Sequence, residues 1–312
     1  MPDWEEIDFS RFVFECQKVG RAPREVREYL EGHGVVVLPV DQYTPIPLLS
    51  EMPESFEGSD AAPNPVYARL FDRELLGDYI RGMTEFAGEF APMTQGDVDN
   101  AREFFWENPL FSFSDAMAYY CFIRMRKPQR IVEIGGSFST LVASAAIEKN
   151  GFGEIICIDA APRPFVGTIP HLSALVQRKI QHIGVPEFQD LLGPASMLFI
   201  DSTHTVKIGS DSLYIYLVLL PSLSRNLLVQ SHDIYLPFGM PQAFSSDHHI
   251  HWNEQYLLYA YLLANSGARI LYGSNYAAHF LADELTTLMA GKYAIGGASL
   301  WYEINRPLEI AF

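Results

Sequence analysis

The chain has 312 residues, of which 48% are hydrophobic, and it carries a formal net charge of −16 at pH 7. This acidity argues against nucleic-acid binding, because neutralising phosphates requires clustered Lys and Arg. No apolar run reaches the roughly 20 residues of a membrane-spanning helix, and the acidic start MPDWEEIDFS has no apolar signal-peptide core. We therefore expect a cytoplasmic enzyme or binding protein that acts on a small molecule, away from membranes.

Three widely spaced cysteines, Cys16, Cys121 and Cys157, fit neither a disulfide framework nor a zinc motif. Cys121 falls in an apolar helical pattern and Cys157 in an apolar run. We expect both to be buried as small hydrophobic residues rather than exposed as nucleophiles.

The first third of the chain is expected to be mainly helical. Its pattern favours a helix within residues 1–34 and a short strand over 35–40, and four prolines from Pro39 to Pro53 then impose an extended path. Helical periods return over 66–92 and over 97–107, the second with Asp97 or Asp99 as its cap. We therefore predict an N-terminal cap region over residues 1–112.

Residues 113–312 show strands that alternate with helices, after a first helix over 114–126. The predicted strands are 130–134, 154–158, 179–183, 196–200, 226–231, 268–272 and 299–304. The predicted helices are 138–149, 165–176, 210–220 and 253–265. This alternation predicts an α/β domain built on a doubly wound, mostly parallel seven-stranded sheet with helices on both faces. The last two strands can pair as a hairpin, which makes the last strand antiparallel.

The stretch RIVEIGGSFSTLVASAAIEKNGFGEIICID, residues 130–159, is the most informative part of the chain. It reads as a strand, a glycine turn, a helix of small residues and a second strand that ends in an acid. Such a βαβ unit binds nucleoside-type ligands at the carboxyl ends of its strands. Asp159 follows Glu133 by 26 positions, about the spacing of a ribose-binding carboxylate.

Polar residues gather at the carboxyl ends of four predicted strands, where doubly wound sheets bind their ligands. They are Glu133, Gly135, Gly136, Ser137, Ser139 and Thr140 after the first strand, Asp159 after the second, Asp201, Ser202, Thr203, His204 and Lys207 after the fourth, and His232 and Asp233 after the fifth. Taken singly, a Gly-Gly pair is a tight turn and a lone Asp is a cap. Their combination favours a functional site.

Asp201, His232 and Asp233 follow neighbouring strands, so the fold should bring them together. Two carboxylates and an imidazole can hold a divalent ion such as Mg²⁺, and they can equally orient one another by hydrogen bonds without a metal. His204 follows Asp201 by three residues, and the ordinary histidine pKa of about 6.5 suits a general base.

Three further histidines, His248, His249 and His251, precede the predicted helix WNEQYLLYAYLL. Adjacent histidines project in different directions, and no partner ligands stand at a matching spacing. We therefore interpret this segment as a loop that lines a pocket, in preference to a metal site. Asn253 and Glu254 should begin the helix, with Glu254 facing the site.

The segments VEIGGSFSTLVA, ICIDAAP, FIDSTH, SHDIYLP and WNEQYLLYAYLL together resemble the class I S-adenosylmethionine-dependent methyltransferases, which have a Rossmann-like sheet. The resemblance is closer to a bacterial group with these segments, and it extends over roughly residues 35–305. It implies S-adenosylmethionine as the cofactor, bound by Glu133, Gly135, Gly136, Ser137, Ser139, Thr140, Asp159 and Asp201. The family's loop reads Gly-x-Gly, whereas this chain places Ser137 where the second glycine is common.

The family also implies a chemistry for the residues after the fourth and fifth strands. By position, Asp201, His232 and Asp233 would hold a divalent metal and His204 would be the catalytic base in an O-methylation. A metal-free version keeps His204 as the base, oriented by Asp233 or Asp201. The acceptor would be a sugar or natural-product hydroxyl, in a pocket lined by aromatics such as Tyr43, Tyr235 and Trp252.

Two other functions compete with methyl transfer. A nicotinamide-dependent oxidoreductase needs G-x-G-x-x-G, which the chain does not supply. A cofactor-binding module without activity is disfavoured by the intact set of acids and histidines. The apolar N-terminal helices also suggest a homodimer surface.

Overall fold

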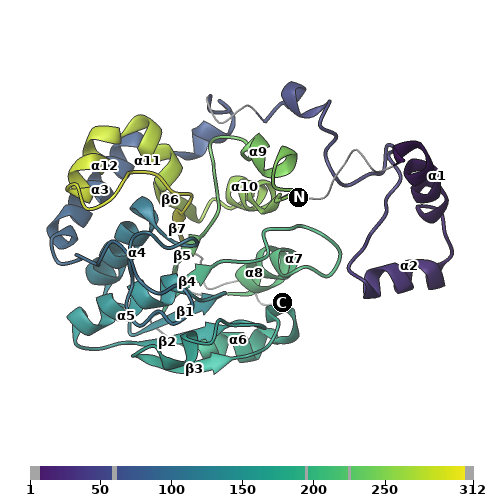
Figure 1. Cartoon of the computed structure of the whole chain (residues 1–312). Coiled ribbons are helices and arrows are strands. Elements are labelled where there is room, and N and C mark those ends of the chain that lie inside the picture. Colours follow the sequence, from purple (N-terminus) through teal and green to yellow (C-terminus); the bar gives the residue numbers. More distant parts are fainter. Residues whose placement is uncertain (1–7, 58–61, 194–195, 224–225, 306–312) are drawn as a thin grey trace. The chain divides into compact units, whose positions relative to one another are not determined.

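The computed structural model describes residues 8–57, 62–193, 196–223 and 226–305 (Figure 1). The chain divides into two compact units, Met1–Ser55 and Phe56–Phe312. Residues 56–112 therefore belong to the same compact unit as the sheet. The predicted boundary at 112/113 does not coincide with this division.

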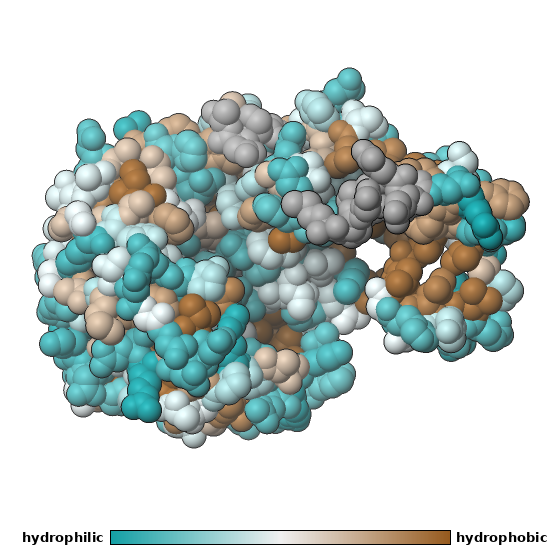
Figure 2. All heavy atoms as spheres, viewed as in Figure 1, coloured by the Kyte–Doolittle hydropathy of each residue, from teal (hydrophilic) through white to brown (hydrophobic). Residues whose placement is uncertain are grey.

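The N-terminal unit contains two helices, α1 (Phe9–Val19) and α2 (Arg24–Gly32), which lie within the predicted helical segment. The first seven residues of that segment lie outside the described residues. The predicted strand over 35–40 is wrong, because these residues belong to no strand or helix. Neither helix has a fully buried residue, and Figure 2 shows apolar side chains gathered on this unit.

The second unit is built on a seven-stranded sheet in the order β3-β2-β1-β4-β5-β7-β6. β7 runs antiparallel to both β5 and β6, and the other neighbouring pairs are parallel. This confirms the predicted Rossmann-like doubly wound sheet and its antiparallel last strand. The strands are β1 (Arg130–Ile134), β2 (Glu154–Ile158), β3 (Leu172–Val176), β4 (Ser196–Ile200), β5 (Leu227–Ser231), β6 (Ala268–Gly273) and β7 (Leu300–Ile304).

The third strand was predicted in the wrong place. Residues 179–183 were expected to form it, but they contain only the 3₁₀ turn Ile180–His182. The segment expected to be a helix, 165–176, instead contains the 3₁₀ turn Val166–Thr168 and then β3, which pairs with β2. Short apolar runs do not separate a strand from a helix by period alone, and the pairing edge of β2 decides the outcome here.

Helices cover both faces of the sheet (Figure 1). Helices α3, α4, α5 and α12 pack against one another as one group. Helix α6 packs on β1, β4 and the π-helical turn Ile215–Leu219, and this turn also contacts α10. The helices are α3 (Arg73–Ala87), α4 (Phe113–Arg126), α5 (Phe138–Asn150), α6 (Val185–Leu192), α7 (Asp211–Tyr214), α8 (Leu220–Ser222), α9 (Gln242–Ser246), α10 (Glu254–Ala264), α11 (Ser274–Phe280) and α12 (Ala282–Met289).

The predicted helix over 97–107 is also wrong. Asp97 accepts hydrogen bonds from the backbone N–H groups of Asp99 and Asn100, so it closes a turn in place of capping a helix. Beyond that turn, Phe105 packs edge-on against Phe138 while Trp106 packs against Phe90. The N–H groups of Trp106 and Glu107 bond to the carbonyls of Met93 and Thr94, so the backbone of this segment pairs with an earlier stretch in place of forming helical bonds.

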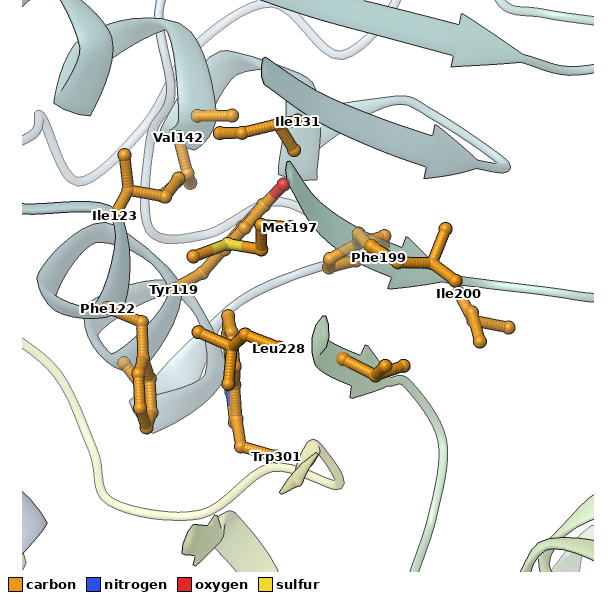
Figure 3. Close-up of a cluster of buried hydrophobic side chains, with 14 of the residues drawn as sticks. Tyr119, Phe122, Ile123, Ile131, Val142, Met197, Phe199, Ile200, Leu228 and Trp301 are labelled. Atoms are coloured by element: carbon orange, nitrogen blue, oxygen red, sulfur yellow. The ribbon is translucent and has the colours of Figure 1, made fainter. Parts of the chain in front are cut away.

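The core lies between α4 and the centre of the sheet (Figure 3). Phe122 stacks on Trp301 of β7 at 4.1 Å between ring centroids, and Tyr119 stacks on Phe199 of β4 at 4.8 Å. Cys121 and Cys157 are buried as predicted, and burial raises the pKa of both thiols. This packing fixes the carboxyl ends of β1, β4 and β5 relative to one another.

Candidate active site

The glycine turn after β1 is fixed by close backbone packing. Gly135 has φ +78° and donates its N–H to the Ile158 carbonyl at 2.9 Å. A Cβ at this position would lie 2.2 Å from the Asp201 carbonyl oxygen, and one on Gly136 would lie 2.5 Å from the Cys157 sulfur. Only glycine fits at Gly135 without a backbone shift. The turn thus brings the ends of β1 and β4 into direct contact.

Ser137 explains the departure from Gly-x-Gly. It is the N-cap of α5, and its hydroxyl accepts a hydrogen bond from the Phe138 N–H at 2.5 Å. Serine is a favoured N-cap because its oxygen satisfies a free helical N–H. The residue therefore serves the start of the helix, and the glycine turn is complete without a second glycine here.

Glu133, Ser139 and Thr140 lie beneath the turn. Glu133 is fully buried, and its two carboxylate oxygens accept hydrogen bonds from the hydroxyls of Tyr119 (2.8 Å) and Thr140. Ser139 and Thr140 are also buried. Burial raises the pKa of Glu133 to about 7, although these hydroxyl bonds oppose the rise. These side chains support the turn from inside, so a contact with the cofactor through them stays a prediction.

Glu133→Gln is expected to stabilise the protein more at alkaline than at acidic pH. A carboxyl whose pKa rises from 4.5 to about 7 on folding stabilises the fold fully below pH 4.5 and loses that contribution as the pH rises through 7. Urea denaturation should show the stability of Glu133→Gln relative to wild type improving by about 3 kcal/mol between pH 4 and pH 8.5. The exposed Glu85→Gln on α3 is the control, and equal pH dependence in both variants would contradict the role of burial.

Asp159 stands at the end of β2, where the sequence predicted a ribose-binding acid. One of its carboxylate oxygens accepts the Ala161 N–H at 2.8 Å, which fixes the side chain beside the sheet edge. The residue lines a pocket of about 380 Å³. The other walls of this pocket are formed by the glycine turn, the segment after β3 and the loop after β4, namely Ile134, Gly135, Ile158, Ala160, Arg178, Lys179, Ile180, Gln181, Asp201, Ser202, Thr203, Lys207, Gly209, Ser210 and Asp211.

The structure brings together Asp201, His204 and Asp233. The His204 Nε2 lies 3.1 Å from Asp201 Oδ1 and 3.4 Å from Asp233 Oδ2. One ligand atom from each of the three residues lies within 4.8 Å of the others, so the group has the spacing of a metal site. His204 (φ 57°) and Asp233 (φ 55°) are both left-handed, an unfavourable conformation that persists where surrounding contacts impose it and that is common at functional sites.

His232 lies beside Asp201 and Asp233, as the sequence predicts, and its role as a metal ligand stays a prediction. Its Nε2 lies 3.5 Å from Asp115, and its Nδ1 lies 3.6 Å from both Asp201 and Asp233. Asp115 is itself held by the backbone N–H groups of Ala298 and Ser299. The geometry therefore favours His204 over His232 as the third metal ligand, and His232 packs behind the two acids with its ring against Phe111.

The histidines and acids of the cluster shift one another's pKa values. Burial alone would lower the pKa of His204, but its hydrogen bonds to Asp201 and Glu254 raise it to about 10. Burial likewise opposes a rise at His232, yet Asp233, Asp115 and Asp201 raise its pKa well above 6.5. Burial would raise the pKa of Asp201, whereas the two histidines hold it well below its usual range.

Two other pockets, each of about 430 Å³, adjoin this cluster. The first is bounded by the glycine turn, Asp159, Asp201–His204, Asp233 and Trp252, whose ring lies 4.5 Å from that of His204. The second lies beyond His232 and Asp233. It is lined by Asn108, Pro109, Leu110, Phe111, Ser112, Phe113, Asp115, Tyr235, Asn275, Gly297 and Ala298. Neighbouring pockets share wall residues, so the three pockets form one cleft along the carboxyl ends of the strands.

Sequence reasoning missed Asp115, which lies 3.5 Å from His232. The sequence does not mark Asp115 as a site residue, because an acid in the first turn of a helix is already explained by its favourable interaction with the helix dipole. Among the described residues, the histidines of 248–251 belong to no group with metal-site spacing. Their prediction as a pocket-lining loop stays a prediction, and His251 contacts Ser245 at 3.1 Å.

No protein-family model matches the chain. An uncharacterized protein of Archaeoglobus fulgidus is 33% identical over 93 residues, which are 28% of this chain and 42% of the relative, so the match spans less than half of that relative's length.

The structural neighbours are S-adenosylmethionine-dependent methyltransferases over most of the chain. The O-methyltransferase TomG of Streptomyces achromogenes, in complex with S-adenosylmethionine, has a TM-score of 0.40 and 14% identity over 78% of this chain and 95% of its own. A Bacillus cereus O-methyltransferase with S-adenosylhomocysteine has a TM-score of 0.39 and 9% identity over 76% and 93%. None of the described helices has both the length and the apolar character to cross a membrane.

Proposed function

We propose that the protein is an S-adenosylmethionine-dependent methyltransferase that methylates a hydroxyl group of a small neutral molecule, such as a sugar or a natural-product intermediate. The observation that carries this proposal is the continuity of the cleft. The pocket of about 380 Å³ shares Gly135, Asp159 and Asp201 with the pocket of about 430 Å³ that contains His204 and Asp233. A methyl donor that lies over the glycine turn would point its reactive end at the cluster of acids and histidines.

The first pocket fits the chemistry of the cofactor. Gly135 lines this pocket without a side chain of its own, and the carboxylate of Asp159 in the same pocket would accept hydrogen bonds from ribose hydroxyls. S-adenosylmethionine supplies an electrophilic methyl group when it is bound. The chain then contributes binding and alignment, because methyl transfer requires the acceptor oxygen in line with the methyl carbon.

The pocket beyond Asp233 is the proposed acceptor site. Its volume of about 430 Å³ lies in the range of small-molecule sites. Leu110, Phe111 and Phe113 provide an apolar wall, and Tyr235 and Asn275 add polar groups. The carboxylates of Asp115 and Asp233 would repel an anionic acceptor. These features support a neutral acceptor with a hydroxyl near Asp233.

The cluster of Asp201, His204 and Asp233 fits a divalent cation. This fit favours the metal-assisted version of the methyl transfer. Asp201, His204 and Asp233 would hold it, since two carboxylates and one imidazole suit Mg²⁺ or Mn²⁺. It would supply positive charge beside the acceptor oxygen and so lower the pKa of the hydroxyl. In the metal-free alternative His204 is the base, but with a pKa raised to about 10 its imidazole already holds a proton at neutral pH.

Asp159→Ala tests the cofactor assignment. Calorimetry should show that wild type binds S-adenosylhomocysteine and that the variant binds it about 10–100-fold more weakly, because hydrogen bonds to a charged group are worth about 1.5–3 kcal/mol each. Asp159→Asn keeps an oxygen for the Ala161 N–H and should therefore fold as wild type. Equal affinity in wild type and Asp159→Ala would contradict the ribose contact, and binding of NAD in its place would overturn the proposal.

A cofactor-binding module without activity is the second candidate. It would bind S-adenosylhomocysteine and transfer no methyl group to any hydroxylated acceptor. The grouping of Asp201, His204 and Asp233 beside the cleft favours catalysis, because a module that only binds the cofactor does not need such a group. Cytoplasmic location and a homodimer stay predictions.

A further inference from the structure

The side of His204 that faces away from Asp201 is held by a buried carboxylate. Glu254, the first residue of α10, is 2% exposed, and its Oε2 lies 2.9 Å from the His204 Nδ1. The same oxygen accepts the Ser202 hydroxyl at 2.5 Å. The other oxygen accepts the Tyr216 hydroxyl at 2.6 Å. Both oxygens of Glu254 thus already act as acceptors.

The backbone of His204 is held by the same end of α10. Its carbonyl accepts hydrogen bonds from the N–H groups of Asn253 (2.9 Å) and Glu254 (3.1 Å). Asn253 also accepts the Val206 N–H at 2.5 Å through its side chain. The left-handed φ of 57° at His204 is therefore imposed by the helix start, which fixes the backbone and the ring together.

The contact between Glu254 and Tyr216 continues into the core. Tyr216 lies in the π-helical turn and is fully buried, and its hydroxyl is 3.0 Å from the Ser231 hydroxyl. Ser231 is in turn 3.1 Å from the hydroxyl of Tyr302 on β7. Buried polar networks are costly unless every member has a partner, and π turns are frequent at functional sites. The turn places the Tyr216 hydroxyl against Glu254.

We propose that Glu254, supported by Tyr216, is the positioning residue of His204. A carboxylate whose oxygens accept hydrogen bonds requires a proton on the His204 Nδ1, and this contact turns Nε2 toward Asp201 and Asp233. A carboxylate behind a histidine fixes its ring and tautomer in this way at many metal and catalytic sites. The position of the proton follows from the contacts alone, whereas its consequence for methyl transfer rests on the proposed function.

Proton NMR of the full chain, with ¹⁵N-labelled histidine, tests the inference directly. Wild type should show a downfield, slowly exchanging N–H signal from the His204 Nδ1, identified by its loss in His204→Gln. Glu254→Gln should abolish or strongly shift this signal, and Tyr216→Phe should shift it and speed its exchange with water. Tyr214→Phe is the matched control, because it removes a 2.7 Å hydroxyl bond to the Ile183 carbonyl that does not reach Glu254.

The outcomes decide the inference even if one variant fails to fold. An Nδ1 signal that is unchanged in folded Glu254→Gln overturns it, and so does a signal in Tyr216→Phe that matches Tyr214→Phe. With an acceptor that wild type methylates, Glu254→Gln should lower kcat about 10–100-fold and leave KM and the affinity for S-adenosylhomocysteine within about twofold. A fall in cofactor affinity of the same size as the fall in kcat would show a merely structural role. Failure of wild type to bind S-adenosylhomocysteine would contradict the proposed function and leave the NMR result standing.

Discussion

His204→Ala is expected to lower kcat for methyl transfer by about 10²–10⁴-fold, which is the range for removal of a general base, with a similar loss if His204 is a metal ligand. The affinity for S-adenosylhomocysteine should change by less than about threefold, because His204 contacts the acids and does not line the pocket of about 380 Å³ beside Asp159. Radiolabelled methyl transfer measures the first quantity and calorimetry the second. A loss confined to cofactor affinity would contradict both roles.

Two further variants keep this test interpretable. Alanine at this position leaves the carboxylates of Asp201, Asp233 and Glu254 without their cation, which is strongly destabilising when the acids are buried. His204→Gln retains a hydrogen-bond donor and should fold more readily while losing the same activity. His171→Ala removes a histidine that pairs with Glu148 before β3, and it should leave kcat unchanged.

Chelation and pH separate the two versions of the mechanism. EDTA should abolish activity, and Mg²⁺ or Mn²⁺ should restore it, if Asp201, His204 and Asp233 hold a metal. Full activity in EDTA would leave only the metal-free version. In that case the base form of His204 exists above its pKa of about 10, so kcat should rise with pH toward about 10, and a plateau below pH 8 would exclude His204 as the base.

The fold was predictable where long alternating patterns coincide with strong local signals. The glycine turn of Gly135 and the small residues of α5 identify one βαβ unit without reference to the rest of the chain. The errors fall on segments whose state depends on distant partners. β3 is a strand because β2 offers it an edge, and residues 105–107 are not helical because their backbone bonds to Met93 and Thr94.

The site was predictable at the level of strand ends and not at the level of contacts. Parallel strands in one sheet bring Asp201 and Asp233 together whatever the side chains do, so their proximity follows from topology. Topology does not decide which histidine lies closest to the two acids. The place of His204 depends on its left-handed backbone and on its contact with Glu254, 50 residues further along the chain. Asp115 is likewise brought to His232 by the packing of α4.

Gly135→Ala is expected to be the most damaging single-atom change at the cleft. Its left-handed φ of +78° costs an alanine about 1 kcal/mol or more. The new Cβ would lie 2.2 Å from the Asp201 carbonyl oxygen, and the Asp201 N–H is bonded to the Ile134 carbonyl at 2.8 Å, so the clash cannot be relieved without separating β1 from β4. We expect a loss of about 3–5 kcal/mol in the free energy of unfolding.

Gly151→Ala separates the cost of the clash from the cost of the backbone conformation. Gly151 caps α5 with φ +74°, and nothing lies within 4 Å of a Cβ placed there. The control should therefore lose only about 1 kcal/mol in urea denaturation and bind S-adenosylhomocysteine as wild type does. Gly135→Ala, where it remains folded, should bind it at least about 100-fold more weakly, because relief of the clash moves the Asp201 backbone. Equal stability and affinity in the two variants would mean that the glycine turn can accommodate a side chain at Gly135. The close contact between the ends of β1 and β4 would then not be required for cofactor binding.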